Sequence, residues 1–150
     1  EIVCKNVDVV SGASVAINGT PIAMDAELGV SPELLDGTIE NVDRGGLAHF
    51  NRRMCRDRQT LERYKQVAPQ RDAADVKQEL VALRENLAVP HARQSIFQRA
   101  LIGQRDRIVP PENQQRCWER LDVPCSLIDA PHFPFFLFHS WEEVFGAADH

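Results

Sequence analysis

The sequence predicts an α/β fold in which a parallel sheet is interrupted by a long helical excursion. Three short apolar runs, each closed by glycine or proline, are typical of buried strands in a parallel sheet. A helical pattern separates the second run from the third, as a crossover between parallel strands requires. The interval 21–95 is helical and polar, so it is longer than a normal crossover and indicates an insertion.

The three strands and the crossover helix can be placed along the chain. The expected strands cover residues 13–17, 96–102 and 124–129. The crossover helix is expected over residues 111–121. Pro111 and Glu112 favour this start, because proline is tolerated in the first turn and glutamate interacts well with the helix dipole. This strand–helix–strand order predicts that the second and third strands pair in parallel.

Helix signals also occur in the long interval and at the C-terminal end. Ser31 and Asp72 are predicted N-caps. The residues after Asp72 form an apolar stripe at helical spacing, namely Val76, Leu80, Leu83 and Leu87. A final helix should begin after Ser140, with Glu143 as its capping-box partner.

We therefore assign residues 1–20 and 96–150 to a partial sheet core, and residues 21–95 to a helical insertion. The pattern is already periodic at the first residue, so residues 1–10 are interpreted as the tail of a helix within a longer protein. Three strands of a larger sheet would expose an unpaired edge and an apolar face. We expect upstream residues or a companion chain to supply the missing strands.

Composition excludes several classes of protein. A net charge of −5 argues against a general nucleic-acid binder, which normally has a basic excess. No apolar run approaches the roughly 20 residues needed to span a membrane. The four cysteines form no Cys-x-x-Cys pair, so neither a metal site nor another cofactor is expected. Reduced thiols in a cytoplasmic protein are the simplest interpretation.

Two polar side chains follow successive expected strands. Asp106 comes after the second strand and His132 after the third. Alone, Asp106 would be an ordinary turn residue and His132 a solvated loop residue. Together they should share one edge of the sheet, where α/β folds place their ligands. An acid that orients a histidine, which in turn takes a proton from serine, is the arrangement of a serine hydrolase. Acid before histidine is the order found in α/β-hydrolases.

The serine of such a triad has no convincing candidate in the sequence. The nearest match to Gly-x-Ser-x-Gly places Ser14 between Gly12 and Ala16. A nucleophile elbow needs a strand before the serine and a helix after it. Residues 18–21, Asn-Gly-Thr-Pro, prevent a helix here, so Ser14 is expected to be a strand residue. We expect the serine upstream of Glu1 or on a companion segment.

A basic run occupies the middle of the helical interval. Residues 52–71 contain seven basic and two acidic side chains in a chain of net charge −5. The run is either a solvated helix face or a contact surface for an acidic partner. The candidate partner-binding residues are Arg52, Arg53 and Arg56.

Four strings of this sequence are similar to the BioG-type pimeloyl-acyl-carrier-protein methyl ester esterases, small α/β-hydrolases of biotin synthesis. The strings are Ala-Ile-Asn-Gly-Thr-Pro at 16–21, Arg-Arg-Met-Cys at 52–55, residues 106–113, and Pro-His-Phe-Pro-Phe at 131–135. The resemblance runs in the same order over nearly all 150 residues. It corresponds to the C-terminal part of an α/β-hydrolase, downstream of the nucleophile.

The resemblance implies hydrolysis of the methyl ester of pimeloyl-acyl carrier protein, with His132 as general base and Asp106 as its orienting acid. It implies that the helical interval is a lid, and that the basic run is a plausible contact for the acidic carrier. Two alternatives stay open. One is a non-catalytic module that binds an acidic partner, and the other is a serine hydrolase of a different acyl ester or thioester.

Overall fold

Three parallel strands form one sheet in the order β1-β2-β3. The computed structural model describes residues 14–87 and 96–149, so the expected helix tail at residues 1–10 lies outside the described residues. The strands are β1 (Val15–Ile17), β2 (Arg99–Gly103) and β3 (Cys125–Ile128). β2 begins three residues later than expected and ends at Gly103 instead of Ile102. The α/β class and the parallel pairing are confirmed.

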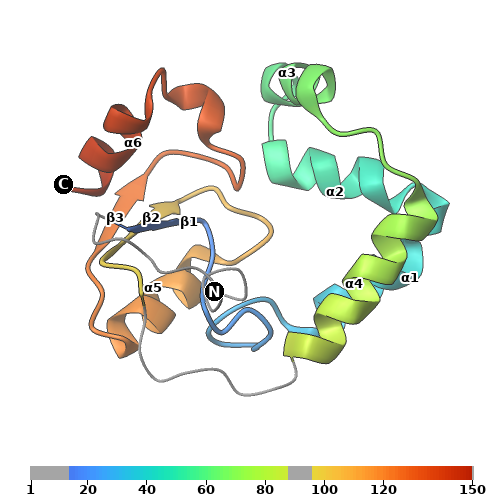
Figure 1. Ribbon diagram of the computed structural model, residues 1–150, viewed down its shortest axis with the longest axis horizontal. Coiled ribbons are helices and arrows are strands. Elements are labelled where there is room, and N and C mark those ends of the chain that lie inside the picture. The colour runs from blue at the N-terminus through green and yellow to red at the C-terminus, as the bar shows by residue number, and fades with distance from the viewer. Residues whose placement is uncertain (1–13, 88–95, 150) are drawn as a thin grey trace.

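Helices cover both faces of this sheet and also form a separate layer. In chain order they are α1 (Pro32–Asn41), η2 (Val42–Arg44), α2 (Gly46–Cys55), α3 (Arg58–Val67), α4 (Ala73–Leu87), α5 (Pro111–Arg120), η3 (Phe135–Leu137) and α6 (Trp141–Ala148). α5 connects β2 to β3 on one face of the sheet, and α6 packs on the other (Figure 1). The hydroxyl of Ser126 donates to the Ala148 carbonyl at 2.9 Å, which ties α6 to β3.

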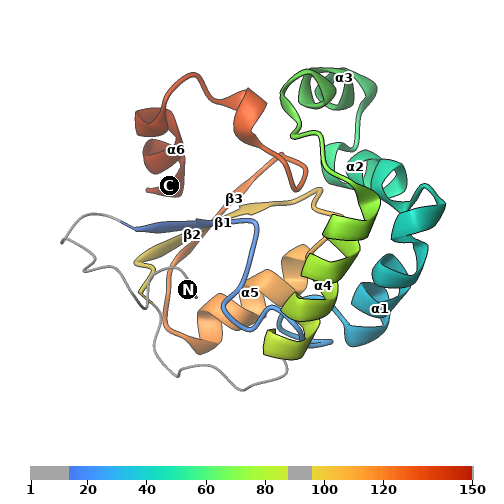
Figure 2. The same ribbon diagram turned by 45° about the vertical axis from the view of Figure 1, so that its right-hand side comes forward.

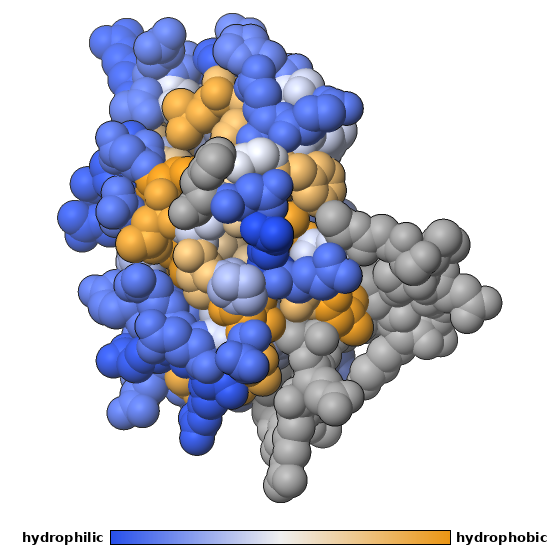
Figure 3. Space-filling view, turned by 90° about the vertical axis from the view of Figure 1, so that its left-hand side faces the viewer, coloured by the Kyte–Doolittle hydropathy of each residue, from blue (hydrophilic) through white to orange (hydrophobic). Residues whose placement is uncertain are grey.

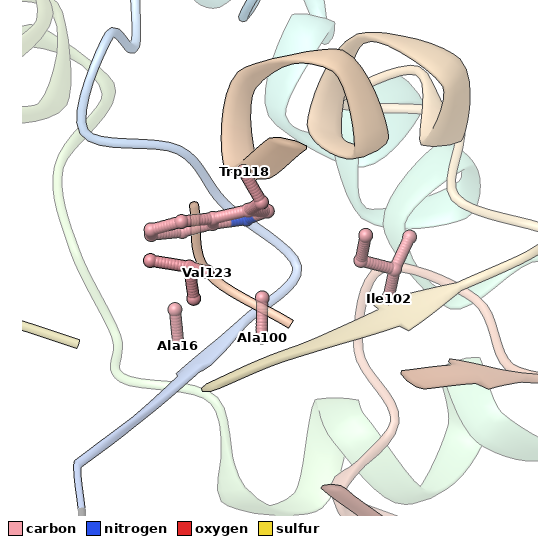
Figure 4. Packing of buried hydrophobic residues seen from close by; sticks show 5 residues of the cluster. All are labelled: Ala16, Ala100, Ile102, Trp118 and Val123. Carbon is pink, nitrogen blue, oxygen red and sulfur yellow. The ribbon is translucent and has the colours of Figure 1, made fainter. Parts of the chain in front are cut away.

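The main apolar core lies between the sheet and α5 (Figure 4). Its buried members are Ala16, Ala100, Ile102, Trp118 and Val123. The small alanines of β1 and β2 leave room for the indole of Trp118, which lies over them and is 1% exposed. The indole N–H donates to the carbonyl of Gly19 at 3.0 Å, so this buried polar atom is satisfied.

The helices α1 to α4 stand as a layer to one side of the sheet (Figures 1 and 2). Both predicted N-caps are confirmed. Ser31 Oγ accepts from the Leu34 N–H at 3.2 Å, and Asp72 Oδ1 accepts from the Ala74 N–H at 2.7 Å. These bonds satisfy N–H groups that the first turn of a helix leaves without partners.

The predicted apolar stripe of α4 is only partly covered. Leu83 is 40% exposed, and the side chain of Leu87 lies outside the described part of the chain. Polar contacts also hold α4 in place, since Arg84 on this helix forms an ion pair with Asp36 of α1. The helical layer therefore combines apolar packing with surface ion pairs.

The last helix begins as predicted, but its capping box has a different partner. Ser140 Oγ accepts from the Glu143 N–H at 3.3 Å. The Glu143 carboxylate was predicted to bond back to Ser140. Instead it reaches one residue further and accepts from the His139 N–H at 2.8 Å. This backbone hydrogen bond holds the pKa of Glu143 below its usual range.

The surface carries apolar side chains among hydrophilic ones on the side of the molecule seen in Figure 3. In and around η3 and α6, the exposed large apolar residues are Phe135, Leu137, Trp141 and Phe145. Within the described residues, β1 pairs only with β2, so its other edge carries no described strand. No helix in residues 14–87 and 96–149 is long and apolar enough to cross a membrane.

Candidate active site

Asp106 and His132 meet at the carboxyl ends of β2 and β3. The Oδ2 atom of Asp106 lies 2.8 Å from Nδ1 of His132, although 26 residues separate them in sequence. The Asp106 side chain is fully buried, and the His132 side chain is 24% exposed. The pair therefore has one end in the protein interior and the other open to the surface.

The Asp106 carboxylate is held by three further hydrogen bonds. Its Oδ1 accepts from the N–H groups of Ile108 and Val109 at 2.7 and 3.0 Å. Its Oδ2 accepts from the side-chain amide of Gln114 at 2.9 Å. Donors around a buried carboxylate stabilise its charge and fix its orientation. The oxygen that faces His132 is thus fixed in place.

Gln114 is a functional candidate that the sequence analysis missed. It is completely buried on α5, and its Nε2 also donates to the Val109 carbonyl at 2.9 Å. Among residues 14–87 and 96–149, its Oε1 has no hydrogen-bond partner. Gln114 shares the buried face of α5 with Cys117 and Trp118, at helical spacings of three and four. Polar residues at helical spacing from Cys117 and Trp118 were the available signal, and the neighbouring Asn113 is buried on α5 as well.

The acid fixes which nitrogen of His132 carries the proton. A carboxylate can only accept, so Nδ1–H donates to Asp106 and the lone pair is left on Nε2. Among the described residues, Nε2 has no hydrogen-bond partner. An imidazole in this state can take a proton at Nε2, and the buried carboxylate then stabilises the imidazolium. This geometry allows proton transfer at Nε2.

The backbone next to the imidazole is bonded on two sides. The Asn18 side chain, at the end of β1, donates to the carbonyl of His132 at 2.9 Å. The N–H of Phe133 donates to the Met54 carbonyl of α2 at 3.2 Å. Asn18 was also missed by the sequence analysis. The rule that identified Asp106, a polar residue just past the carboxyl end of a strand, applies equally to Asn18.

Aromatic rings anchor the residues after His132 to the helical layer. The Phe133 ring makes edge contacts with Tyr64 of α3 at 5.1 Å and with Phe136 at 5.1 Å between centroids. The guanidinium of Arg63 lies 4.1 Å from the centre of the Phe136 ring. Such ring and cation contacts add to the stability gained from burying apolar surface. The histidine loop is therefore packed against α3 as well as α2.

Ser14 lies at the amino ends of the strands, opposite to the carboxyl ends where this pair lies. It precedes β1, whereas Asp106 and His132 follow the ends of β2 and β3 in a parallel sheet. Its hydroxyl donates to the Ile96 carbonyl at 2.7 Å. Ser14 was predicted to be a strand residue, and it stands one position before the strand.

The described cysteines are not activated nucleophiles. Cys55, Cys117 and Cys125 are free thiols, and the first two are buried. Burial raises the pKa of Cys55, and the nearby Asp57 raises it further. Burial also raises the pKa of Cys125, to about 11. A reactive cysteine needs a lowered pKa, so these thiols are protonated at neutral pH.

The three arginines proposed to bind a partner lie at the end of α2. Arg52 and Arg56 are exposed, and neither forms an ion pair with a described residue. Arg53 differs, because its guanidinium donates to the Arg107 carbonyl at 2.5 Å, in the turn after Asp106. The end of α2 therefore carries two exposed cations, Arg52 and Arg56, and a third, Arg53, that holds the turn after Asp106.

Two surface hollows adjoin Arg53. One, of about 630 Å³, has Asp106, Arg107 and Leu127 in its wall. The other, of about 520 Å³, lies between α1 and α2. Leu34 and Arg53 line both. His132 is not among the lining residues of either hollow, although its partner Asp106 lines the larger one.

Known proteins are similar to this chain in sequence and in structure. Residues 2–144 match the sequence model of a family described as pimeloyl-ACP methyl esterase BioG. The crystal structure of BioG from Haemophilus influenzae is similar, with a TM-score of 0.82 and 28% identity, over 91% of this chain and 63% of that one.

Two curated relatives are similar in sequence. A malonyl-[acyl-carrier protein] O-methyltransferase of Bacteroides fragilis is 33% identical over 120 residues, which are 80% of this chain and 24% of the relative. An uncharacterized protein of Haemophilus influenzae is 31% identical over 133 residues, which are 88% of this chain and 61% of the relative. The chain thus spans less than two thirds of each curated relative.

Proposed function

The chain belongs to the BioG family of pimeloyl-ACP methyl esterases, and from this premise we propose that it carries the acid and histidine of a serine carboxylesterase of the α/β-hydrolase class. The proposed substrate is the methyl ester of pimeloyl-acyl carrier protein. The observation that carries the proposal is the 2.8 Å contact between Asp106 and His132, with Nε2 of the imidazole left without a described partner.

In the proposed reaction, Nε2 of His132 takes the hydroxyl proton as a serine oxygen attacks the ester carbonyl carbon. The tetrahedral intermediate then breaks its bond to the methoxy oxygen, and His132 returns the proton so that methanol leaves. A water molecule repeats the sequence on the acyl-serine and frees the pimeloyl carboxylate. Throughout, Asp106 stabilises the transient imidazolium.

The serine is proposed to come from a companion segment or chain. Ser14 lies at the far edge of the sheet, and the described cysteines have raised pKa values. The chain covers 63% of the similar BioG structure, which leaves part of that protein without a counterpart here. The proposed companion would place a serine hydroxyl within hydrogen-bond reach of His132 Nε2.

Ester hydrolysis fits the Asp106–His132 pair better than the methyl transfer named for the Bacteroides fragilis relative. The matched segment is 24% of that relative, so its name can describe chemistry performed by the remaining part. Methylation of a carboxylate uses a nucleophile that is already ionised at neutral pH and needs no general base. Hydrolysis of an ester does need one, and a histidine held by a buried acid supplies it.

The helical layer is proposed to be a lid that receives the acyl carrier protein. Arg52 and Arg56 offer exposed positive charge at the end of α2, and Arg53 joins the same helix end to the Asp106 turn. Met54, between them in sequence, contacts the backbone next to His132. An acidic carrier bound to these arginines would therefore dock beside the histidine.

The proposal is tested on the intact protein, together with whatever segment carries the serine. Fluorophosphonate labelling and methanol release from the pimeloyl carrier ester should both occur, and both should be lost in His132→Ala. His139→Ala is the matched control, because the side chain of His139 is 90% exposed and contacts only Glu143 among the described residues. Equal loss in the two variants would contradict the proposed role of His132.

The two rival functions give different results in the same experiment. A non-catalytic module would bind the carrier but would take up no fluorophosphonate and release no methanol. A hydrolase of another acyl ester or thioester would be labelled, but would turn over its own substrate faster than the pimeloyl methyl ester. Comparing kcat/KM across carrier-linked esters and thioesters separates this case from the proposed one.

A further inference from the structure

We propose that Asn18 is the positioning residue for the acid–histidine pair, because its side-chain amide links the loop that carries His132 to the turn that carries Asp106. The proposal rests on the proposed function, in which His132 acts as the base. Asn18 would not touch substrate. It would act through the backbone, by setting where the imidazole stands relative to the carboxylate.

All the polar atoms of the Asn18 side chain are used. Its Nδ2 donates to the carbonyls of Pro131 and His132 at 3.0 and 2.9 Å, and its Oδ1 accepts from the Gly103 N–H at 2.6 Å. The residue is 4% exposed. The orientation of the amide is fixed, since the two carbonyls can only accept and the N–H can only donate.

Gly103 connects this amide to the acid. Its N–H is bonded to Asn18, and its carbonyl accepts from the Asp106 N–H at 3.0 Å. A Cβ at this position would lie 2.6 Å from the Ala130 carbonyl oxygen and 2.9 Å from that of Pro131. Only glycine lets the ends of β2 and β3 approach this closely. Asn18 therefore reaches the acid through one residue and the histidine directly.

The backbone of Asn18 also favours asparagine at this position. Its φ is 48°, in the left-handed region that asparagine tolerates better than most residues. Its N–H donates to the Leu101 carbonyl at 3.0 Å, which continues the pairing of β1 with β2. Glycine would suit the backbone but has no amide. Aspartate would keep the shape and the acceptor, but a carboxylate cannot donate to the two carbonyls.

These differences define the variants. In the intact protein, Asn18→Gly and Asn18→Asp are compared with the native protein and with Asp122→Gly. Asp122 is an exposed residue with a φ of 56°, so its change to glycine matches the backbone effect of Asn18→Gly away from the site. The readouts are kcat, KM, the unfolding midpoint, and the NMR signal of the His132 Nδ1 proton bonded to Asp106.

Both Asn18 variants should lower kcat by about 10²-fold with KM within about twofold of native, on the scale of a 1 Å misplacement of a catalytic group. The Nδ1 proton signal should shift or broaden in both, and Asp122→Gly should change neither. If either folded Asn18 variant keeps the native kcat and the native proton signal, the proposal is overturned, even if its unfolding midpoint falls.

The two proposals can fail separately. If the intact native protein hydrolyses no ester or thioester, the proposed function fails. The Nδ1 proton signal still reports whether Asn18 sets the geometry of the pair in that case. A native-like signal in a folded Asn18→Asp protein would then overturn the positioning role.

Discussion

Nδ1 of His132 is hydrogen-bonded to Oδ2 of Asp106 at 2.8 Å, in a pair whose acid is fully buried. Asp106→Asn keeps the shape of the acid but offers the imidazole an amide. The His132 tautomer that carries its proton on Nε2 then becomes favoured, and this nitrogen can no longer accept a proton. The kcat should therefore fall by about 10⁴-fold, as in other triads. Asp129→Asn is the matched control, because Asp129 follows β3 as Asp106 follows β2, but its side chain is 79% exposed. Steady-state ester hydrolysis measures both, and an Asp106→Asn protein with a tenth of native activity would contradict the assignment.

The buried amide of Gln114 should contribute to stability through the acid. Gln114→Met keeps the volume but removes the donation to Asp106, so the free energy of unfolding should fall by about 1.5–3 kcal/mol, as expected for a hydrogen bond to a charged group. Gln114→Glu should destabilise more, because two carboxyl groups would share one buried space. Urea unfolding at pH 7 measures both changes. The reverse order of the two variants would show that the amide does not support the carboxylate.

Arg52 should affect binding of the carrier and not the chemistry. Arg52→Glu should raise KM for a carrier-linked ester roughly fivefold at low salt, the effect of about 1 kcal/mol from an exposed charge pair. The increase should shrink at high salt, because exposed charges are screened. Arg120→Glu makes the same charge change at the exposed end of α5 and should leave KM unchanged. Equal effects of the two variants would indicate attraction to net charge instead of a docking site.

Trp118 should dominate the stability of the sheet core. It is 1% exposed and satisfies its indole N–H on Gly19. Trp118→Ala should lower the free energy of unfolding by about 3–5 kcal/mol, through lost burial and the cavity that remains. Trp141→Ala removes an indole that is 64% exposed and should cost about 0.5 kcal/mol or less. Denaturant unfolding compares them, and similar losses would contradict this location of the core.

Cys125 should make stability depend on pH in the alkaline range. Burial raises its pKa from 9.0 to about 11, so the folded protein keeps the thiol proton where the unfolded chain loses it. The contribution of the thiol is complete below pH 9 and is lost as pH rises toward 11. Native protein should therefore lose more stability over this interval than Cys125→Ala. Unfolding midpoints at pH 8 and pH 10.5 test this, and parallel losses would refute it.

Local sequence patterns were enough to predict the sheet and its crossover. The run around Leu101 is apolar and is closed by Gly103, so burial on both faces of a strand could be inferred without the partner strands. Pro111 predicted the start of α5, because proline is tolerated in the first turn of a helix. The start of β2 was predicted three residues early, because Ile96 continues the apolar run although pairing with β3 begins only at Ala100.

The supporting residues of the site could not be derived in this way. Asn18 bonds to backbone groups 85 and 114 positions away. Because almost every residue carries the same N–H and carbonyl groups, no sequence pattern marks these two as its partners. The bond of Gln114 to Asp106 spans only 8 residues, but it depends on how α5 packs against the end of β2. Strand order alone could place Asp106 beside His132. The groups that hold the pair in position depend on packing that only the folded chain specifies.

The peptide unit between His132 and Phe133 is bonded through its carbonyl to Asn18 at the end of the sheet and through its N–H to Met54 of α2. This has a consequence for engineering. Exchanging the helical segment for that of a relative, in order to change substrate preference, would also remove the acceptor for the Phe133 N–H. A transplanted segment must therefore present a backbone carbonyl at the same point. Otherwise the chimera will carry a new helical segment, but the peptide unit after His132 will lose one of its two hydrogen bonds.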